Sequence, residues 1–276
     1  MAKAFFRDIL KFVARESIPP AALRGFKAAR RRLRANKPFP VPGSRLVMTH
    51  RGTDEDVELF DTIILQGAYN FTRTSKNREI EALYASIDKP LILDLGANIG
   101  AASVWFAAKF PRTTVIAVEP ELANFALLEK NMAGVKGRAV HGAIAAEPGE
   151  LPIFDPGMGT AGFRTMTDGN EKPVGSVRAY TLDEIAAMAP DCTPFVVKID
   201  IEGFERELFT KHAKILDDVP IVILELHDWF RTGSSQTFLD WHRSQDRDLE
   251  HTYDNVFSIS NKHLPRVASN GAGRRA

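Results

Sequence analysis

The sequence predicts an α/β domain whose mostly parallel β-sheet carries helices on both faces. From residue 91 onward, short apolar runs alternate with amphipathic segments, and this alternation is typical of a parallel sheet that is buried on both sides. A glycine-rich turn follows the first apolar run, in the segment LDLGANIG. The chain has 276 residues, and 44% of them are hydrophobic, so it can bury the large core that such a domain needs.

Strands and helices are expected to alternate along the chain. Apolar runs rich in β-branched residues predict the strands, and apolar residues three or four positions apart predict the helices. The expected strands are residues 91–95, 113–119, 137–145, 175–180, 194–201 and 219–227, with a closing strand pair in 251–260. The expected helices are residues 100–110, 121–134, 181–190, 203–216 and 235–245. Residues 150–165 are expected to form a loop and a hairpin.

Three further segments flank this domain, which we place at residues 89–265. Residues 46–88 have a mostly helical pattern and are expected to lead into the domain or cap it. Residues 1–45 contain 12 Lys or Arg and 2 acidic residues, which defines a basic helical arm in front of an acidic body. Residues 266–276 are small and polar and are predicted to be a flexible tail.

The first 35 residues of the basic arm allow two interpretations. Phe5, Ile9 and Phe12 form an apolar stripe at helical spacing, which can pack on the body while the charged side chains are solvated. A basic amphipathic helix of this kind also binds anionic membrane surfaces. The second interpretation would make the protein peripheral to the inner membrane surface.

Cysteine content and hydropathy predict a cytoplasmic location. The chain has one cysteine, Cys192, so it forms no intramolecular disulfide and no zinc site built on several cysteines. No apolar run reaches the roughly 18–20 residues of a membrane span. Charged residues interrupt the N-terminal apolar segment that a signal peptide would need. The sequence does not indicate the oligomeric state.

The turn after the first strand is expected to hold a cofactor. Asp94, Gly96, Asn98 and Gly100 form the pattern Asp-x-Gly-x-Asn-x-Gly. Glu119 ends the next strand, where an acid accepts hydrogen bonds from ribose hydroxyls. NAD and S-adenosyl-L-methionine both suit such a turn. Asp94 would repel the pyrophosphate of NAD and can face the positive charge of a sulfonium, so the residues favour S-adenosyl-L-methionine.

Two neighbouring strands are expected to bring charged side chains to the same edge of the sheet. Lys198 and Asp200 share one face of an otherwise apolar strand, and a buried charge needs a partner or a function. We expect Lys198 to pair with Asp94 or Asp200. The expected rim of the cleft consists of Asp200, Glu202, Glu225 and His227.

In this order and spacing the motifs resemble the FkbM-type family of S-adenosylmethionine-dependent methyltransferases. The resemblance covers residues 69–227 and rests on LILDLGANIG, VIAVEP, YTLDEI and above all VVKIDIEGFERELF. It implies a Rossmann-like methyltransferase fold, with a seven-stranded, mostly parallel sheet and a terminal antiparallel strand. It also implies an O-methyltransferase that acts on a hydroxyl of a sugar, glycan or natural product.

The expected cofactor contacts follow from these positions. Gly96, Asn98 and Gly100 would shape the pocket for the amino-acid end of the cofactor, Asp94 would lie beneath it and Glu119 would bind the ribose. Ala143 and Ile144 either lie near the adenine or pack in the core. Tyr69 and Asn70 are expected to close over the cofactor.

The expected catalytic residues are His227, Asp200 and Glu202. His227 is the first candidate for the general base that removes the acceptor proton, because its ordinary pKa is near neutrality. Asp200 is the second candidate. Glu202 either lines the site or complements the N-terminus of the following helix. A Mg²⁺ or Mn²⁺ ion held by the rim is an alternative that this interpretation does not favour.

Other functions remain as alternatives. The enzyme could act at the membrane surface on a lipid-linked glycan. The basic segment KAARRRLRANK is also typical of nucleic-acid binding, which the acidic body and the lack of an Asn-Pro-Pro-Tyr-type motif do not favour. An NAD-dependent dehydrogenase is a further alternative, against which Asp94 argues. The acceptor itself cannot be predicted from the sequence.

Overall fold

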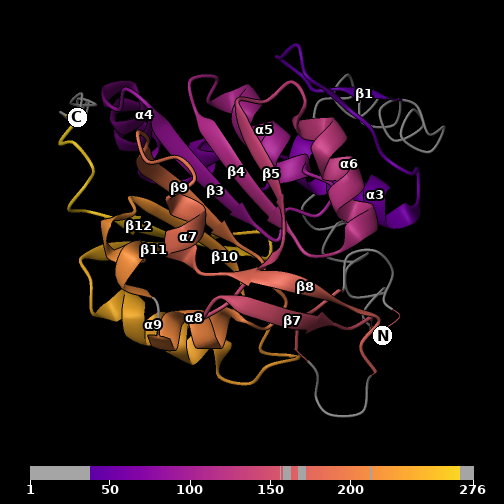
Figure 1. Ribbon diagram of the computed structural model, residues 1–276. Helices are drawn as coiled ribbons and strands as arrows, with labels where there is room; N and C mark the ends of the chain where they lie inside the picture. Colours follow the sequence, from indigo (N-terminus) through magenta and orange to yellow (C-terminus); the bar gives the residue numbers. More distant parts are fainter. Residues whose placement is uncertain (1–37, 156, 158–162, 167–171, 212, 268–276) are drawn as a thin grey trace, which may run out of the picture.

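The computed structural model describes residues 38–155, 157, 163–166, 172–211 and 213–267. One seven-stranded sheet forms its centre, with the strand order β11-β12-β10-β9-β3-β4-β5 (Figure 1). These strands are β3 (Pro90–Leu95), β4 (Thr114–Glu119), β5 (Gly137–His141), β9 (Thr193–Ile199), β10 (Ile221–Glu225), β11 (Arg247–Thr252) and β12 (Asn255–Ser260). The basic arm up to residue 37 and the tail from residue 268 lie outside the described residues, so their predicted structures stay predictions.

The direction of the strands confirms the predicted fold class. Strands β5, β4, β3, β9 and β10 are parallel to one another, as expected for apolar strands separated by helices. Strand β12 pairs antiparallel with β10 on one side and with β11 on the other. The last strand of the described chain is therefore the antiparallel one, and it lies inside the sheet between β10 and β11.

Helices cover both faces of this sheet. The main ones are α3 (Asp54–Phe60), α4 (Asn77–Ser86), α5 (Ala101–Lys109), α6 (Leu122–Met132), α7 (Leu182–Ala186), α8 (Glu205–Lys211) and α9 (Ser234–Arg243). Alternate residues of the strands enter two separate cores. Ile92 and Val115 pack with α4, α5, α6 and the lead-in segment, while Leu93 and Ile116 pack with α7, α8 and α9. This is the two-sided burial that the continuous apolar strands predict.

The lead-in segment is part of the first core. It contains β2 (Val47–Met48), helix α3, a π-helical turn (Asp61–Leu65) and a 3₁₀ turn (Phe71–Arg73). Strand β2 forms a short hairpin with β1 (Phe39–Pro40), so the end of the arm predicted to be helical is a strand at these two residues. Phe60 and Phe71 are almost fully buried among the side chains under the sheet. The segment therefore closes one face of the domain.

A second, smaller sheet corrects two of the predicted strands. Residues 137–145 form two strands, β5 and β6 (Ala143–Ile144), because the chain changes direction at Gly142. Strand β8 (Gly175–Tyr180) pairs with β6 and with β7 (Gly149–Ile153), not with the central sheet. A Cβ at Gly142 would lie 2.5 Å from the Tyr180 ring, so only glycine permits this approach.

None of the described helices is both long and apolar enough to span a membrane.

Candidate active site

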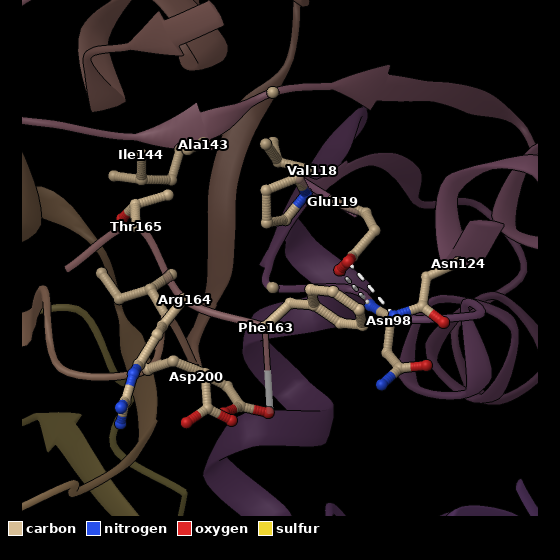
Figure 2. A pocket seen from close by; sticks show the side chains of 15 residues that line it. Asn98, Val118, Glu119, Asn124, Ala143, Ile144, Phe163, Arg164, Thr165 and Asp200 are labelled. Atoms are coloured by element: carbon tan, nitrogen blue, oxygen red, sulfur yellow. Dashed lines mark hydrogen bonds between the residues drawn. The ribbon is translucent and has the colours of Figure 1, made fainter. Parts of the chain in front are cut away.

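A cleft opens where the parallel strands end, as expected for an open α/β sheet. Its walls come from the segments after β3, β4, β5 and β9 and from residues 163–165 (Figure 2). The residues that line it are Gly96, Asn98, Val118, Glu119, Pro120, Asn124, Gly142, Ala143, Ile144, Phe163, Arg164, Thr165, Asp200, Ile201 and Glu202. Of the residues predicted to bind a cofactor, Gly96, Asn98, Glu119, Ala143 and Ile144 line this cleft.

The turn after β3 requires glycine at position 96, because the segment after β9 approaches the backbone there. Gly96 has a φ of 77°, and a Cβ there would lie 1.7 Å from the carbonyl oxygen of Asp200. Asn98 also has a positive φ, of 50°. Gly100 packs against Leu128 of α6 and is not among the residues that line the cleft, so its predicted contact with the cofactor stays a prediction. Its φ of 88° starts helix α5.

Glu119 is held in place by main-chain donors. One of its carboxylate oxygens accepts a hydrogen bond from the Asn98 amide at 2.8 Å, and the other accepts one from the Glu121 amide at 3.0 Å. The side-chain amide of Asn124 donates to the second oxygen at 3.4 Å. Burial raises the pKa of Glu119 to about 7 against these hydrogen bonds. Since a carboxylate oxygen can accept two hydrogen bonds, the Oε2 atom retains capacity for a ligand hydroxyl.

The raised pKa of Glu119 gives a prediction for Glu119→Gln. The folded protein holds this proton up to about pH 7, whereas the ordinary pKa is 4.5. Stability from this group is therefore fully present below pH 4.5 and is lost as the pH rises to about 7. Glutamine does not titrate, so the free energy of unfolding of the variant should rise by about 3 kcal/mol relative to wild type between these two pH values. Urea unfolding at several pH values measures the difference, and parallel pH profiles would contradict the prediction.

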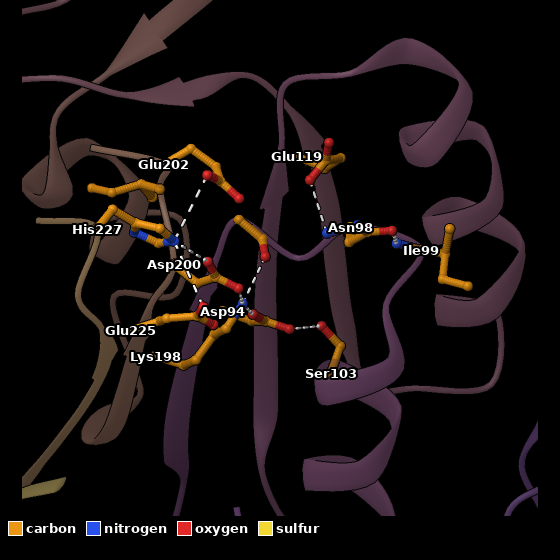
Figure 3. Close-up of polar contacts among 12 residues, drawn as sticks. Asp94, Asn98, Ile99, Ser103, Glu119, Lys198, Asp200, Glu202, Glu225 and His227 are labelled. Carbon is orange, nitrogen blue, oxygen red and sulfur yellow. Dashed lines mark hydrogen bonds and ion pairs between the residues drawn. The ribbon is translucent and has the colours of Figure 1, made fainter. Parts of the chain in front are cut away.

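Asp94, Lys198 and Asp200 form a buried ion-pair network beneath the turn (Figure 3). The Lys198 ammonium lies 3.2 Å from Asp94 Oδ1 and 3.2 Å from Asp200 Oδ2, and it donates to the Gly96 carbonyl at 2.6 Å. The Ser103 hydroxyl donates to Asp94 Oδ2 at 2.6 Å. Burial opposes the charge of Lys198, but the charges of Asp200 and Asp94 outweigh it and raise the pKa of the lysine. The predicted pairing of Lys198 is confirmed.

The four rim residues meet as the strand pattern predicts. The Nε2 atom of His227 lies 3.7 Å from a carboxylate oxygen of Asp200, 3.7 Å from one of Glu202 and 3.8 Å from one of Glu225 (Figure 3). Glu202 reaches this position through a left-handed backbone with a φ of 50°, which is uncommon outside glycine. Two neighbouring strands thus supply one acidic rim beside the cleft.

A buried carboxylate behind His227 was not predicted. Glu205 is fully buried, and its Oε1 atom lies 2.9 Å from His227 Nδ1. Its signal in the sequence is the second acid of the segment EGFE, three positions after Glu202 and in the first turn of α8.

The surroundings of His227 argue against its predicted role as general base. Burial lowers the pKa of the imidazole, but the hydrogen bond to Glu205 and the charge of Asp200 outweigh burial and raise the pKa to about 10. Burial and the charge of Asp200 raise the pKa of Glu202 to about 8 and that of Glu225 to about 7. In this arrangement His227 carries a proton at neutral pH and has no lone pair with which to accept another.

Two more side chains lie near the site, one that was predicted to belong to it and one that was not. Tyr69 is buried, stacks on Phe106 at a centroid distance of 5.4 Å and is not among the residues that line the cleft, so its predicted closure over a cofactor stays a prediction. Burial raises the pKa of the Tyr69 hydroxyl, the charge of Lys198 lowers it and the charge of Asp200 raises it. Arg164 was not predicted; its guanidinium carbon lies 3.8 Å from the centroid of the Phe230 ring.

The known sequences that match this chain are described as methyltransferases. A family model described as "Methyltransferase FkbM domain" matches residues 94–253, more than half of the chain. Methyltransferase 1 of Beauveria bassiana is 24% identical over 174 residues, which cover 54% of this chain and 70% of the relative. Hexuronic acid methyltransferase AglP of Haloferax volcanii is 26% identical over 141 residues, which cover 50% of this chain and 56% of the relative. The match therefore spans little more than half of the Haloferax protein.

Solved structures of methyltransferases resemble the chain at low identity. The SAH-bound Podospora anserina methyltransferase PaMTH1 covers 94% of this chain and 96% of its own, with 12% identity and a TM-score of 0.38. The METTL16 MTase domain covers 89% of this chain and 94% of its own, with 10% identity and a TM-score of 0.44.

Proposed function

Because the chain belongs to the FkbM methyltransferase family, we propose that it transfers a methyl group from S-adenosyl-L-methionine to a hydroxyl of a sugar, glycan or natural product. One observation carries the choice of cofactor. Glu119 stands at the end of β4 beside the Asn98 turn, buried and facing the cleft, with capacity to accept a hydrogen bond. This is the position from which an acid binds a ribose.

The charges of the cleft also fit this cofactor. The ionisable residues that line it are Glu119, Arg164, Asp200 and Glu202, so acids outnumber bases. An acidic cleft attracts a cationic ligand and repels a pyrophosphate. The residues present therefore suit the sulfonium and ammonium groups of S-adenosyl-L-methionine better than they suit NAD.

When bound, S-adenosyl-L-methionine supplies an electrophilic methyl group on a sulfonium. The chain contributes mainly alignment, because a well-oriented nucleophile removes much of the barrier. Asp200, a member of the acidic rim that lines the cleft, is placed to accept a hydrogen bond from the acceptor hydroxyl and to take up its proton.

A sugar or glycan acceptor is supported by an exposed aromatic side chain beside the rim. Trp229 is 65% exposed, and its ring lies 6.4 Å from the ring of His227. Exposed indoles offer a flat apolar surface with one polar edge, which suits the face of a sugar ring. The relative from Haloferax volcanii, named as a hexuronic acid methyltransferase, is consistent with this class. The membrane-surface and nucleic-acid alternatives depend on the basic arm, most of which lies outside the described residues.

Calorimetric titration tests the cofactor. We expect micromolar binding of S-adenosylhomocysteine and no binding of NAD. Glu119→Ala should weaken the first at least about tenfold, since one or two hydrogen bonds to a charged group are lost. Glu150→Ala, which removes an exposed acid of β7, is the matched control and should bind like wild type.

Two results would sink this proposal. One is binding of NAD alone, and the other is an S-adenosylhomocysteine affinity that Glu119→Ala leaves unchanged. Circular dichroism of each variant shows whether a loss of binding reflects a loss of folding.

A further inference from the structure

We infer that the acidic rim is a binding site for one divalent cation, held by Asp200, Glu202 and His227. In methyl transfer this cation would position the acceptor, a role that rests on the proposed function. The three residues each offer one ligand atom, and these atoms lie within 4.8 Å of one another (Figure 3).

The first argument is the imidazole of His227. The ring is 3% exposed, and its Nε2 atom points among three carboxylates at 3.7–3.8 Å. Each of these distances exceeds the range of a hydrogen bond. A nitrogen of a buried ring that lies close to three carboxylates and within hydrogen-bond range of none is the arrangement that a shared ion would satisfy. Imidazole binds such an ion through a neutral nitrogen, so the cation would displace the Nε2 proton that His227 carries in its absence.

The second argument is the carboxylate behind the imidazole. Glu205 is fully buried and holds the Nδ1 atom of His227 at 2.9 Å. Histidines that bind metals almost always have their other nitrogen held by a carboxylate or carbonyl, which fixes the ring with the free nitrogen toward the metal. Glu205 is therefore a positioning residue for Nε2.

The third argument is the local charge. Carboxylates of Asp94, Asp200, Glu202, Glu205 and Glu225 gather around Lys198 and His227. Lys198 is engaged by Asp94 and by Oδ2 of Asp200, which leaves Oδ1 of Asp200 on the His227 side. Among these residues the acids exceed the bases, and a divalent cation would balance the excess. Oxygen and imidazole ligands suit Mg²⁺ or Mn²⁺.

The position of the site gives it a function in recognition of the acceptor. Asp200 and Glu202 also line the cofactor cleft, so the cation would lie at its border. An octahedral cation with three protein ligands has positions left for other oxygens. Two neighbouring oxygens of the acceptor, as in a sugar diol or a hydroxyl beside a carboxylate, would fill them and bring one hydroxyl to the cleft.

Titration with Mn²⁺, followed by the loss of the free-ion electron paramagnetic resonance signal, tests the site in the full chain after treatment with EDTA. We expect one Mn²⁺ per chain with a Kd below about 1 mM. Glu202→Gln and His227→Asn should each weaken binding at least about tenfold. Glu202 is partly exposed, so its variant is expected to fold. Glu55→Gln removes an exposed acid of α3 and should leave binding unchanged.

A second titration, of S-adenosylhomocysteine into the same EDTA-treated samples, distinguishes a failure of the cation site from a failure of the proposed function. Binding of S-adenosylhomocysteine without Mn²⁺ binding would overturn the cation site and leave the cofactor assignment intact. A Mn²⁺ site that both rim substitutions leave unchanged would overturn it as well. A rim-dependent Mn²⁺ site without S-adenosylhomocysteine binding would support the site and contradict the proposed cofactor.

Discussion

Replacing Gly96 by alanine is expected to destabilise the protein by more than about 3 kcal/mol, or to prevent folding. Two costs add at this position. The φ of 77° places a non-glycine residue in the left-handed region, and the new Cβ would lie 1.7 Å from the Asp200 carbonyl oxygen. That oxygen belongs to the backbone of the strand-end turn and cannot rotate away.

Alanine substitutions at two other glycines allow the backbone cost and the steric cost to be measured separately. Gly43 has a φ of 73° and open space around its Cβ position, and Gly175 has open space without a positive φ. Urea unfolding should therefore rank the alanine variants with Gly96→Ala far below Gly43→Ala, and Gly43→Ala below Gly175→Ala. A stability of Gly96→Ala within about 1 kcal/mol of Gly43→Ala would show that the turn can move away from Asp200.

Lys198→Met is expected to cost about 3–5 kcal/mol of stability. The lysine side chain is 4% exposed, and it lies between the fully buried carboxylate of Asp94 and that of Asp200. Removal of its charge leaves Asp94 buried without a cation, which is more costly than removal of both partners. Methionine retains the length of the apolar stem, so the loss reports on the charge.

A double-mutant cycle completes this test. Asp94→Asn should recover part of the loss when it is combined with Lys198→Met, because the uncompensated charge is then absent. Additive losses in chemical unfolding would mean that the two charges do not depend on each other. In that case the ion pair beneath the turn would have to be reconsidered.

The sequence predicted the parts of the site that follow from strand periodicity. Lys198 and Asp200 alternate with apolar residues, and Glu225 and His227 do the same one strand later, so their meeting at one edge follows from the parallel order of β9 and β10. The acid at the end of β4 and the glycine turn after β3 were predictable for the same reason.

Features set by tertiary contact could not be predicted in this way. The ring of Tyr180 packs against Gly142, where a predicted strand is divided into β5 and β6, and Leu128 of α6 packs against Gly100. Glu205 occupies a first helical turn, where an acid is usually explained by the helix dipole. Its contact with His227 becomes visible only when α8 and β10 are placed together.

The position of β12 has a consequence for biosynthesis. Strand β10, which carries Glu225, is bordered by β9 on one side and by β12 on the other, and β12 (Asn255–Ser260) is made after β10. Until residues 255–260 emerge, the edge formed by Ile221–Glu225 stays open in the nascent chain. An apolar edge of this kind pairs readily with other chains. The edge of β10 is therefore protected from aggregation only after residues 255–260 have been made, which is later than the synthesis of every residue of the acidic rim.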